Sequence, residues 1–458
     1  MSFPRYPKHK DSGVEWLGEV PEHWKVKRLR FVAELNPSKS EVSHLDRDTT
    51  VSFLPMEAIG DDGMLSLDKE KTLGEVESGY TYFREGDVTV AKITPCYENG
   101  KGAVMSGLIN GIGFGTTELI VARPYPGEIV GTYLHYLFIS PDFRSIGESH
   151  MYGAGGQKRV PDAFVRNFAT AFPPLAEQTA IAGFLDRETG KIDELVAEQR
   201  RLLELLKEKR QAVICHAVTR GLNPAAPLKP SGLEWLGDVP KQWEIKPLKY
   251  SITKIEQGWS PQCESEPAAE NEWGVLKVGC GNRDRFDPNE QKALPLDIEP
   301  LPIYEIKPGD ILMSRGNTLE LVGSAAFVEQ VRPRLLLCDL LYRFRAKAER
   351  AESEFLVLSL RSPNVRFQIE RDATGTSSSM KKIGQGTIRE FVIALPPLNE
   401  QRAIIAYIKN ETAKLDTLTA EAERAIDLLQ ERRTALISAA VTGQIDVRRS
   451  AGFQTGFA

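Results

Sequence analysis

The feature that most constrains this 458-residue chain is an internal duplication that ends in two closely matched segments. Residues 172–219 align without a gap onto 395–442, a shift of 223, and 24 of the 48 paired positions are identical. A second repeat links "SGVEWLGEVPEHWKVKRL" from Ser12 to "SGLEWLGDVPKQWEIKPL" from Ser231. Self-similarity at a fixed period indicates repeated structural units. We therefore expect two related blocks, each followed by a better-matched helix.

Each matched segment begins with two prolines and then carries apolar residues at steps of three and four, the period of an amphipathic helix. Interleaved charges are typical of the flanks of a coiled coil. From 189 to 218 the helix would be about 45 Å long, too long to bury its apolar stripe on one block. The predicted partner is the other copy, in an antiparallel coiled coil with a pseudo-twofold axis that packs 192–217 against 415–440. The alternative is two helices packed on separate cores.

The predicted contact residues of this helical spacer share the apolar stripe. They are Ile192, Leu195, Leu202, Leu206 and Val213 in the first copy, and Leu415, Leu418, Leu429 and Leu436 in the second.

The globular blocks mix two kinds of pattern, which predicts an α+β fold. Stretches such as "DVTVAKI", "TELIVARP" and "DILMSR" alternate between Gly, Pro and Asp boundaries, as strands do. "YLHYLFISPDFRS" and "EFLVLSLRSPNVRFQIER" have helical periodicity. We expect a curved mixed or antiparallel sheet in each block. The predicted order is a first globular domain (1–172), a helical spacer (173–222), a second globular domain (223–395), a second spacer (396–446) and a tail (447–458).

Composition limits the class of protein. Hydrophobic (41%) and charged (26%) contents are ordinary for globular chains. The chain has no run of 18 apolar residues, the length that would predict a membrane-spanning helix. The five cysteines are scattered and odd in number, which favours a reducing cytoplasm over a disulfide framework. The six histidines form no metal-ligand spacing, and no Walker or dinucleotide-binding glycine spacing occurs. A net charge of −5 is unusual for a protein that binds phosphates, unless cations cluster or a partner supplies charge.

One set of residues resembles the D…E-x-K pattern of metal-dependent nucleases: Asp297, Glu305 and Lys307. In the first half the residue aligned with Glu305 is Tyr82, and the segment leads into a Gly-Asp turn shared by both halves. We therefore expect no catalytic site in this chain and no metal bound by it.

Basic and small polar residues recur at matching places in the two blocks. One group follows a predicted strand, and the other ends the glycine-rich "GAGGQKRV" and its counterpart "GTSSSMKKI". Arg, Lys and Asn side chains suit base edges in the major groove, whereas paired cations beside small residues suit phosphates. For any single lysine a solvated surface position is the alternative. The predicted DNA-binding residues are Lys92, Thr94, Lys158 and Arg159 in the first block, and Arg315, Asn317, Lys381 and Lys382 in the second.

Over nearly its whole length the chain resembles the specificity subunits of Type I restriction-modification enzymes. The resemblance is carried by the paired "SG-x-EWLG" segments, the "GQKRV" loop, and the doubled "PPL-x-EQ" segments whose helices end in "AVT". It implies a non-catalytic subunit with two target recognition domains, each reading one half of a bipartite site in double-stranded DNA. The helices would fix the spacing, about 13 base pairs for a span of about 45 Å, and would dock two modification subunits.

The resemblance also implies how the rest of the assembly divides the work. The chain would need no cofactor of its own, because modification subunits carry S-adenosylmethionine and restriction subunits use ATP and Mg²⁺. Two other functions compete with this interpretation. A self-contained endonuclease would need the Asp297 set to be real, and a coiled-coil adaptor would not bind DNA at all.

Overall fold

The computed structural model describes residues 3–154, 156–263, 266–282, 285–375 and 380–448 of the chain. By its internal contacts the chain divides into two compact units. Unit 1 comprises Met1–Arg200 and Glu423–Ala458, and unit 2 comprises Arg201–Ala422. Each unit combines one globular block with one end of each long helix, α5 (Leu175–Arg220) and α9 (Leu398–Val441).

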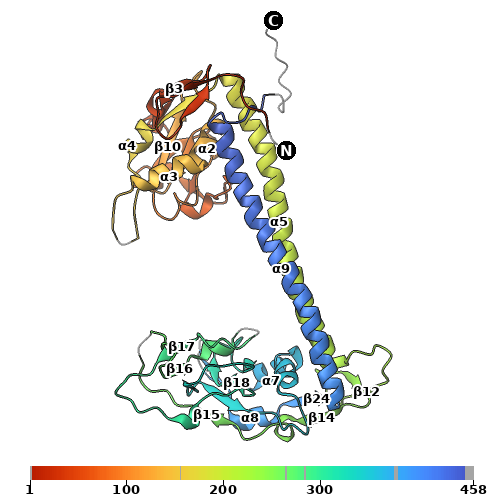
Figure 1. The fold of residues 1–458 in the computed structure, drawn as a ribbon. Coiled ribbons are helices and arrows are strands. Elements are labelled where there is room, and N and C mark those ends of the chain that lie inside the picture. Colours follow the sequence, from red (N-terminus) through yellow and green to blue (C-terminus); the bar gives the residue numbers. More distant parts are fainter. Residues whose placement is uncertain (1–2, 155, 264–265, 283–284, 376–379, 449–458) are drawn as a thin grey trace. The chain divides into compact units, whose positions relative to one another are not determined.

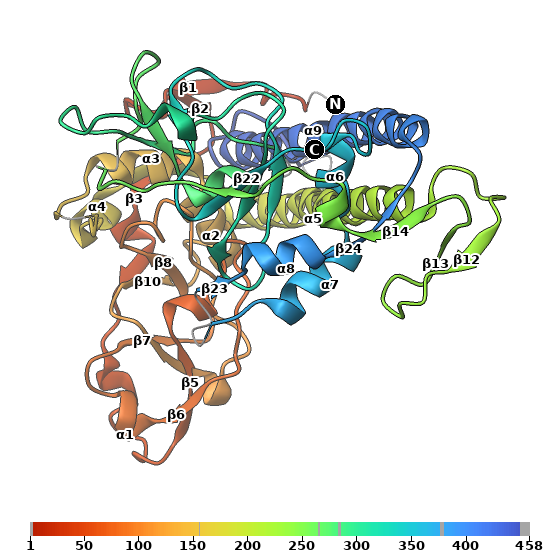
Figure 2. The ribbon, with the colours of Figure 1, turned by 90° about the horizontal axis from the view of Figure 1, so that it is seen from below.

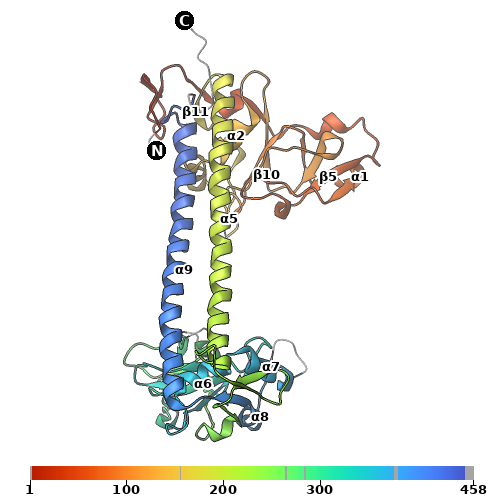
Figure 3. The ribbon, with the colours of Figure 1, turned by 90° about the vertical axis from the view of Figure 1, so that its right-hand side faces the viewer.

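The two long helices are antiparallel (Figure 3). In unit 1, residues 181–185 at the start of α5 share a hydrophobic core with 436–441 at the end of α9. In unit 2, residues 217–218 at the end of α5 share a core with 404–408 at the start of α9. Each end of one helix therefore packs with the opposite end of the other, as predicted, and the alternative of helices on separate cores is wrong.

Two ion pairs between the helices display the pseudo-twofold relation directly. In unit 1, Nε of Arg433 donates to Oδ1 of Asp193 at 2.9 Å. In unit 2, Arg210 forms the corresponding pair with Asp416. The shift of 223 converts Arg210 into Arg433 and Asp193 into Asp416, so the two copies exchange the same contact, as an isologous interface requires.

The predicted register of the helix pair is wrong at three leucines. Leu195, Leu202 and Leu418 lie outside the seam and are 50%, 40% and 46% exposed. Leucines occur on two faces of these helices, so leucine alone does not identify the seam. On α5 the buried position after Ile192 is Val196. The other predicted seam residues are buried (Ile192, Leu206, Leu415 and Leu436) or partly buried (Val213 and Leu429).

The glutamine of each PPL-x-EQ motif fastens the start of the long helix to its globular block. Gln178 accepts a hydrogen bond from the Val130 backbone N–H at 2.8 Å and donates to the Pro173 carbonyl at 2.9 Å. Gln401 makes the same two bonds, with the Glu352 N–H at 2.9 Å and with the first proline carbonyl of its own motif at 2.8 Å. Both glutamines are buried, and a buried amide needs such partners. The motif is therefore explained by structure.

The globular part of unit 1 contains several small sheets in place of the single curved sheet predicted. An inner sheet has the order β4-β10-β8, and an outer mixed sheet has the order β6-β5-β9-β7. The inner sheet and α2 lie between α5 and the outer sheet (Figures 2 and 3). The strands are β1 (His9–Asp11), β2 (Glu19–Pro21), β3 (Lys25–Arg28), β4 (Ala33–Leu35), β5 (Thr50–Leu54), β6 (Glu70–Thr72), β7 (Thr81–Arg84), β8 (Val88–Ala91), β9 (Ile112–Gly115), β10 (Leu119–Pro124) and β11 (Ala169–Phe172). The helices are α1 (Leu73–Val76), α2 (Gly131–Ile139), α3 (Pro141–Ser149) and α4 (Asp162–Asn167).

Unit 2 repeats the inner part of this plan with different sheets around it. Its main sheet is antiparallel, with the order β15-β22-β18-β20, and a second sheet has the order β17-β16-β21. The strands are β12 (Leu228–Pro230), β13 (Asp238–Pro240), β14 (Glu244–Pro247), β15 (Glu256–Gln257), β16 (Gly274–Leu276), β17 (Gln291–Ala293), β18 (Ile311–Ser314), β19 (Gly316–Asn317), β20 (Ala325–Phe327), β21 (Leu335–Leu336), β22 (Leu341–Phe344), β23 (Lys381–Lys382) and β24 (Val392–Leu395). The helices are α6 (Ser353–Leu360), α7 (Pro363–Asp372) and α8 (Gln385–Glu390).

The shared Gly-Asp turns form a buried anchor in each block. The turn glycines, Gly86 and Gly309, have φ of 83° and 92°, a conformation that favours glycine. The aspartate that follows, Asp87, is buried and accepts a hydrogen bond from Nε of Arg123 at 2.7 Å. Its counterpart in unit 2 receives Nε of Arg345 at 2.7 Å. These turns are accounted for by the fold.

Candidate nucleic-acid interface

In unit 1 the two predicted DNA-binding regions, at 92–94 and 158–159, lie on one short β ladder. The Val160 N–H donates to the Lys92 carbonyl at 2.8 Å, and the Thr94 N–H donates to the Lys158 carbonyl at 2.9 Å. Ile93 is bridged to Arg159 in antiparallel fashion. All four predicted residues of this block are therefore neighbours, although no sequence pattern had joined the two regions.

Unit 2 repeats the same ladder. The Ile383 N–H donates to the Arg315 carbonyl at 2.9 Å, which is the counterpart of the first bond in unit 1. Strand β19 pairs with β23, placing Asn317 opposite Lys381 and Gly316 opposite Lys382. We call the two ladders, with the hairpins that end in 158–159 and 381–382, the basic hairpins of units 1 and 2.

Each basic hairpin turns back on a glycine that no other residue replaces without strain. Gly153 and Gly375 have φ of 124° and 134°. A Cβ at Gly153 would lie 2.7 Å from a backbone carbonyl oxygen across the hairpin, and one at Gly375 would also lie 2.7 Å from such an oxygen. Residue 155 and residues 376–379 of the predicted glycine- and serine-rich loops lie outside the described residues. In unit 1 the described residues on either side of residue 155 belong to the connection between α3 and α4 (Figure 1).

The cations of the basic hairpins differ in freedom. Lys158 and Lys382 are exposed. Lys381 donates through Nζ to the Gly375 carbonyl at 2.6 Å. Arg159 donates to the Glu118 carboxylate through two parallel bonds, from Nε at 2.9 Å and from Nη2 at 2.8 Å. The exposed lysines suit phosphates, whereas Arg159 is held in one orientation.

The remaining predicted residues bond to groups of their own block. Thr94 donates through Oγ1 to Glu98 at 3.1 Å. Arg315 donates through Nη1 to the Asp339 carbonyl at 3.4 Å, and Asn317 donates through Nδ2 to Oδ1 of Asn282 at 3.3 Å. All three side chains are partly buried against their own block, and none is as exposed as Lys158 or Lys382.

Sequence analysis missed Glu118. Its carbonyl accepts the Lys92 N–H at 2.9 Å, which places its carboxylate beside the hairpin cations. The hydrogen bonds from Arg159 lower the pKa of Glu118, and the carboxylate in turn raises the pKa of Arg159. No periodicity or spacing links residue 118 to residue 159, because their contact is made only when the ladder forms.

Two residues of the set that resembles a nuclease motif make structural hydrogen bonds, Glu305 through its side chain and Lys307 through its backbone. The Glu305 carboxylate accepts the Arg334 backbone N–H at 2.8 Å, and the Lys307 N–H donates to Asp310 at 2.8 Å. Among the described residues no group of three or more His, Cys, Asp or Glu side chains is arranged to hold a metal ion. Within the same part of the chain, no helix is long and apolar enough to cross a membrane.

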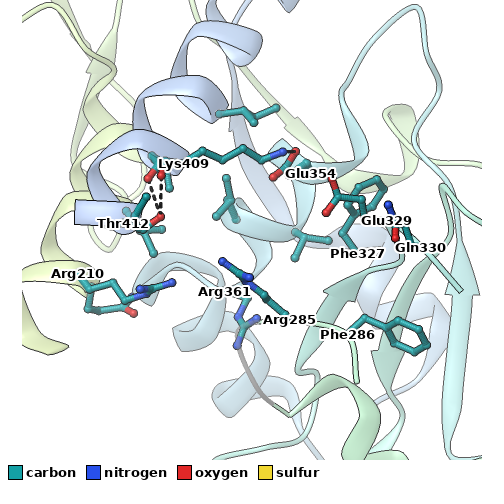
Figure 4. A pocket seen from close by; sticks show the side chains of 17 residues that line it. Arg210, Arg285, Phe286, Phe327, Glu329, Gln330, Glu354, Arg361, Lys409 and Thr412 are labelled. Atoms are coloured by element: carbon teal, nitrogen blue, oxygen red, sulfur yellow. Dashed lines mark hydrogen bonds and ion pairs between the residues drawn. The ribbon is translucent and has the colours of Figure 1, made fainter. Parts of the chain in front are cut away.

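Unit 2 contains a cavity of about 640 Å³ beside the helix pair (Figure 4). Its lining mixes cations with Glu329 and Glu354, and Lys409 pairs with Glu354 at 2.8 Å. When Ser140 and Pro141 of unit 1 are set against Ser362 and Pro363 of unit 2, a shift of 222, Tyr136 takes the place of Leu358 of this lining. The Tyr136 hydroxyl donates to Asp186 at 2.7 Å. The labelled cations of the cavity lining are Arg210, Arg285, Arg361 and Lys409 (Figure 4).

Exposed leucines form a second apolar stripe on both long helices. Leu205 and Leu428 are 52% and 59% exposed, and the shift of 223 relates them. Leu195 and Leu418 are a second related pair on the same stripe. Leu205 and Leu428 were not among the predicted contact residues, although they are identical residues at paired positions of the duplication.

Comparisons with known proteins decide the family. Residues 240–426 match the model of the Type I restriction modification DNA specificity domain. The chain is 30% identical to the Type I restriction enzyme EcoEI specificity subunit of Escherichia coli, over 92% of this chain and 83% of that protein. The chain belongs to the family of Type I restriction enzyme specificity subunits.

Other relatives agree with this assignment. This specificity-subunit homologue is 48% identical to the Type I restriction enzyme EcoAI specificity subunit of Escherichia coli over 36% of this chain and 27% of that protein. It shares its fold with a chain from a structure of a type I R-M system assembly (TM-score 0.71, 20% identity, 92% and 98% of the two chains). It also shares its fold with the HsdS subunit of Thermoanaerobacter tengcongensis (TM-score 0.54, 20% identity, 93% and 98%).

Proposed function

We propose that this chain is the DNA-reading subunit of a Type I restriction-modification complex, and that each unit reads one half of a bipartite site in double-stranded DNA. The observation that carries the proposal is the repetition of the basic hairpin. The same backbone bond, from 160 to 92 and from 383 to 315, places two basic residues at the same point of two blocks that otherwise diverge. The duplication accounts for the shared backbone bond, and a phosphate-binding role accounts for cations at both ladders in blocks whose other residues diverge.

Within each basic hairpin the chemistry divides between affinity and readout. Exposed lysines such as Lys158 and Lys382 supply salt-dependent phosphate contacts. Arg159, Arg315 and Asn317 carry the donor patterns that distinguish base edges in the major groove. Each hairpin carries two adjacent cations, and such a local cluster is compatible with DNA binding at a net charge of −5.

The long helices have two jobs in this proposal. Packing of α5 against α9 along their seam would set the spacing between the two half-sites. The exposed leucine stripe gives each helix a second apolar face, and repetition of the stripe by the duplication suits two copies of one partner. We assign this stripe to the docking of two modification subunits, with restriction subunits joining that core.

The chemistry belongs to those partners in this account. The chain carries no catalytic role, S-adenosylmethionine is bound by the modification subunits, and ATP and Mg²⁺ serve the restriction subunits. The assembly acts in the cytoplasm, where its DNA lies. A self-contained endonuclease is disfavoured because the Glu305 carboxylate caps a backbone N–H.

Hairpin variants test the proposal against the adaptor alternative. In complex with its modification subunits, K158A/R159A in unit 1 and K381A/K382A in unit 2 should each weaken binding to duplex DNA by about tenfold or more. K381A/K382A should also lower the slope of log Kd against log salt by about 2, one for each phosphate contact removed, and K158A/R159A should lower it by about 1, because Arg159 is assigned to a base edge. The control is K191A, an exposed lysine of α5 away from the hairpins. Unchanged DNA affinity and salt slope in both double variants would contradict the proposal.

A further inference from the structure

The ion pair between Arg159 and Glu118 distinguishes the basic hairpin of unit 1 from that of unit 2. Its two bonds use both carboxylate oxygens, with the arginine side chain 35% exposed and the glutamate side chain 24% exposed. In unit 2 the residue that takes the place of Glu118 on the ladder is Leu340, whose carbonyl accepts the Arg315 N–H at 2.8 Å. Unit 2 therefore has no carboxylate at this position.

Both ends of the pair are anchored by backbone bonds. Arg159 exchanges two hydrogen bonds with Tyr152 across the hairpin, at 3.1 Å and 2.9 Å. Glu118 directly precedes β10, its carbonyl accepts the Lys92 N–H, and its own N–H donates to Oγ1 of Thr116 at 3.2 Å. The guanidinium is thus fixed in position as well as in orientation, although about a third of the side chain still faces solvent.

The bonds to Glu118 leave one edge of the guanidinium available. An arginine carries five N–H donors in a planar fork. Glu118 takes the Nε donor and one Nη2 donor. The two Nη1 donors and the outer Nη2 donor remain, and in the described part of the chain no hydrogen bond is made by Nη1 of Arg159. That outer edge presents two parallel donors, which match the O6 and N7 acceptors of guanine.

The carboxylate also changes what the arginine contributes to DNA binding. Pairing with Glu118 offsets the charge of Arg159, so the pair adds little to phosphate attraction, which Lys158 next to it supplies. Holding the fork before binding removes the loss of side-chain entropy that a free arginine suffers on contact. The pair is therefore suited to discrimination between bases and poorly suited to general affinity.

We propose that Glu118 is a positioning residue that presents the outer edge of Arg159 to a guanine in the half-site read by unit 1. This inference rests on the proposed function of the basic hairpins. It makes the two units unequal: unit 1 reads one G·C pair through a held arginine, whereas unit 2 has an unheld lysine, Lys382, at the matching position.

The test compares variants in the complex with modification subunits on duplexes that carry the mapped site with single base-pair changes. For E118Q we expect discrimination at one G·C pair of one half-site to fall about tenfold, the scale of one bidentate base contact. R159K, which keeps the charge and loses the fork, should lose discrimination at the same base pair. Discrimination throughout the other half-site should stay unchanged. The control E34Q removes an exposed carboxylate from β4 of the same unit.

The outcomes separate this inference from the proposed function. If E118Q and R159K weaken all sites equally and leave every base preference intact, the ion pair only supports the hairpin and the inference is overturned. The same holds if both variants keep full discrimination while K158A/R159A still weakens DNA binding. If the hairpin double variants have no effect on DNA affinity, the proposed function itself fails.

Discussion

At the scale of single residues, the proposed contacts with DNA rest on exposed lysines such as Lys158 and on an arginine, Arg159, that its carboxylate partner holds in place. Lys158 and Lys382 were identified because the duplication repeats them, and both are exposed. Glu118 was not predicted, because its partner, Arg159, lies on a separate segment and contacts it only when the ladder has formed. Residues whose role depends on a distant partner cannot be found from local pattern, whereas repeated residues can.

One buried group gives unit 1 a pH dependence that unit 2 lacks. The Nδ1 atom of His135 is buried and has no hydrogen-bond partner among the described residues. Burial, with the nearby positive charge of Arg433, lowers the pKa of His135 to about 4. The equivalent residue of unit 2 is Val357.

The sign of this effect follows from which state binds the proton. Between pH 6.5 and 4 the unfolded chain protonates this histidine and the folded unit does not, so folding is favoured at higher pH and is weakened as pH falls. The loss is at most about 1.4 kcal/mol per pH unit. Hydrogen exchange, corrected for intrinsic rates, should show protection of α2 falling with acid more steeply than that of α6. H135V should remove the difference, and an equally steep loss in H135V would contradict the assignment.

At the scale of elements, the matched helices and their antiparallel pairing followed from length, period and duplication. The register did not, because leucines occupy both the seam and the second stripe, and hydrophobicity does not tell the two apart. Burial separates them: Leu206 is 7% exposed, whereas Leu205 beside it is 52% exposed. The segments 133–145 and 354–371 were each predicted as one helical piece, but each is divided into two helices, because Pro141 and Pro363 begin a second helix.

The second stripe carries a prediction about assembly. L205E and L428E should each weaken the docking of one modification subunit, because each removes one exposed leucine from one of two equivalent surfaces. A leucine buried on docking contributes about 1.5–3 kcal/mol, or roughly tenfold to a hundredfold in affinity. Native mass spectrometry should then show complexes with a single modification subunit at concentrations that load the parent chain with two.

The control for this prediction is A197E, which places the same charge on an exposed face of α5 outside the stripe. It should retain two modification subunits. If L205E and L428E also retain two, the stripe does not dock them.

At the scale of the whole molecule, the duplication allowed the class and the order of parts to be predicted. It did not predict where the compact units divide, between Arg200 and Arg201 and between Ala422 and Glu423. Sequence similarity marks the prolines that precede each helix, whereas contacts group each block with the end of the other copy's helix. The outer sheet of unit 1, β6-β5-β9-β7, was also not predicted, since its strands are only three to five residues long.

The central claim is that the two units read two separated halves of one DNA site. Adenine-methylation mapping of the host genome, with and without this gene and with R315A/N317A in its place, tests that claim most directly. The account predicts a gapped, two-part methylated motif that disappears without the gene, and whose second half alone becomes less selective in the variant. A continuous motif, or a methylation pattern that does not depend on the gene, would contradict it.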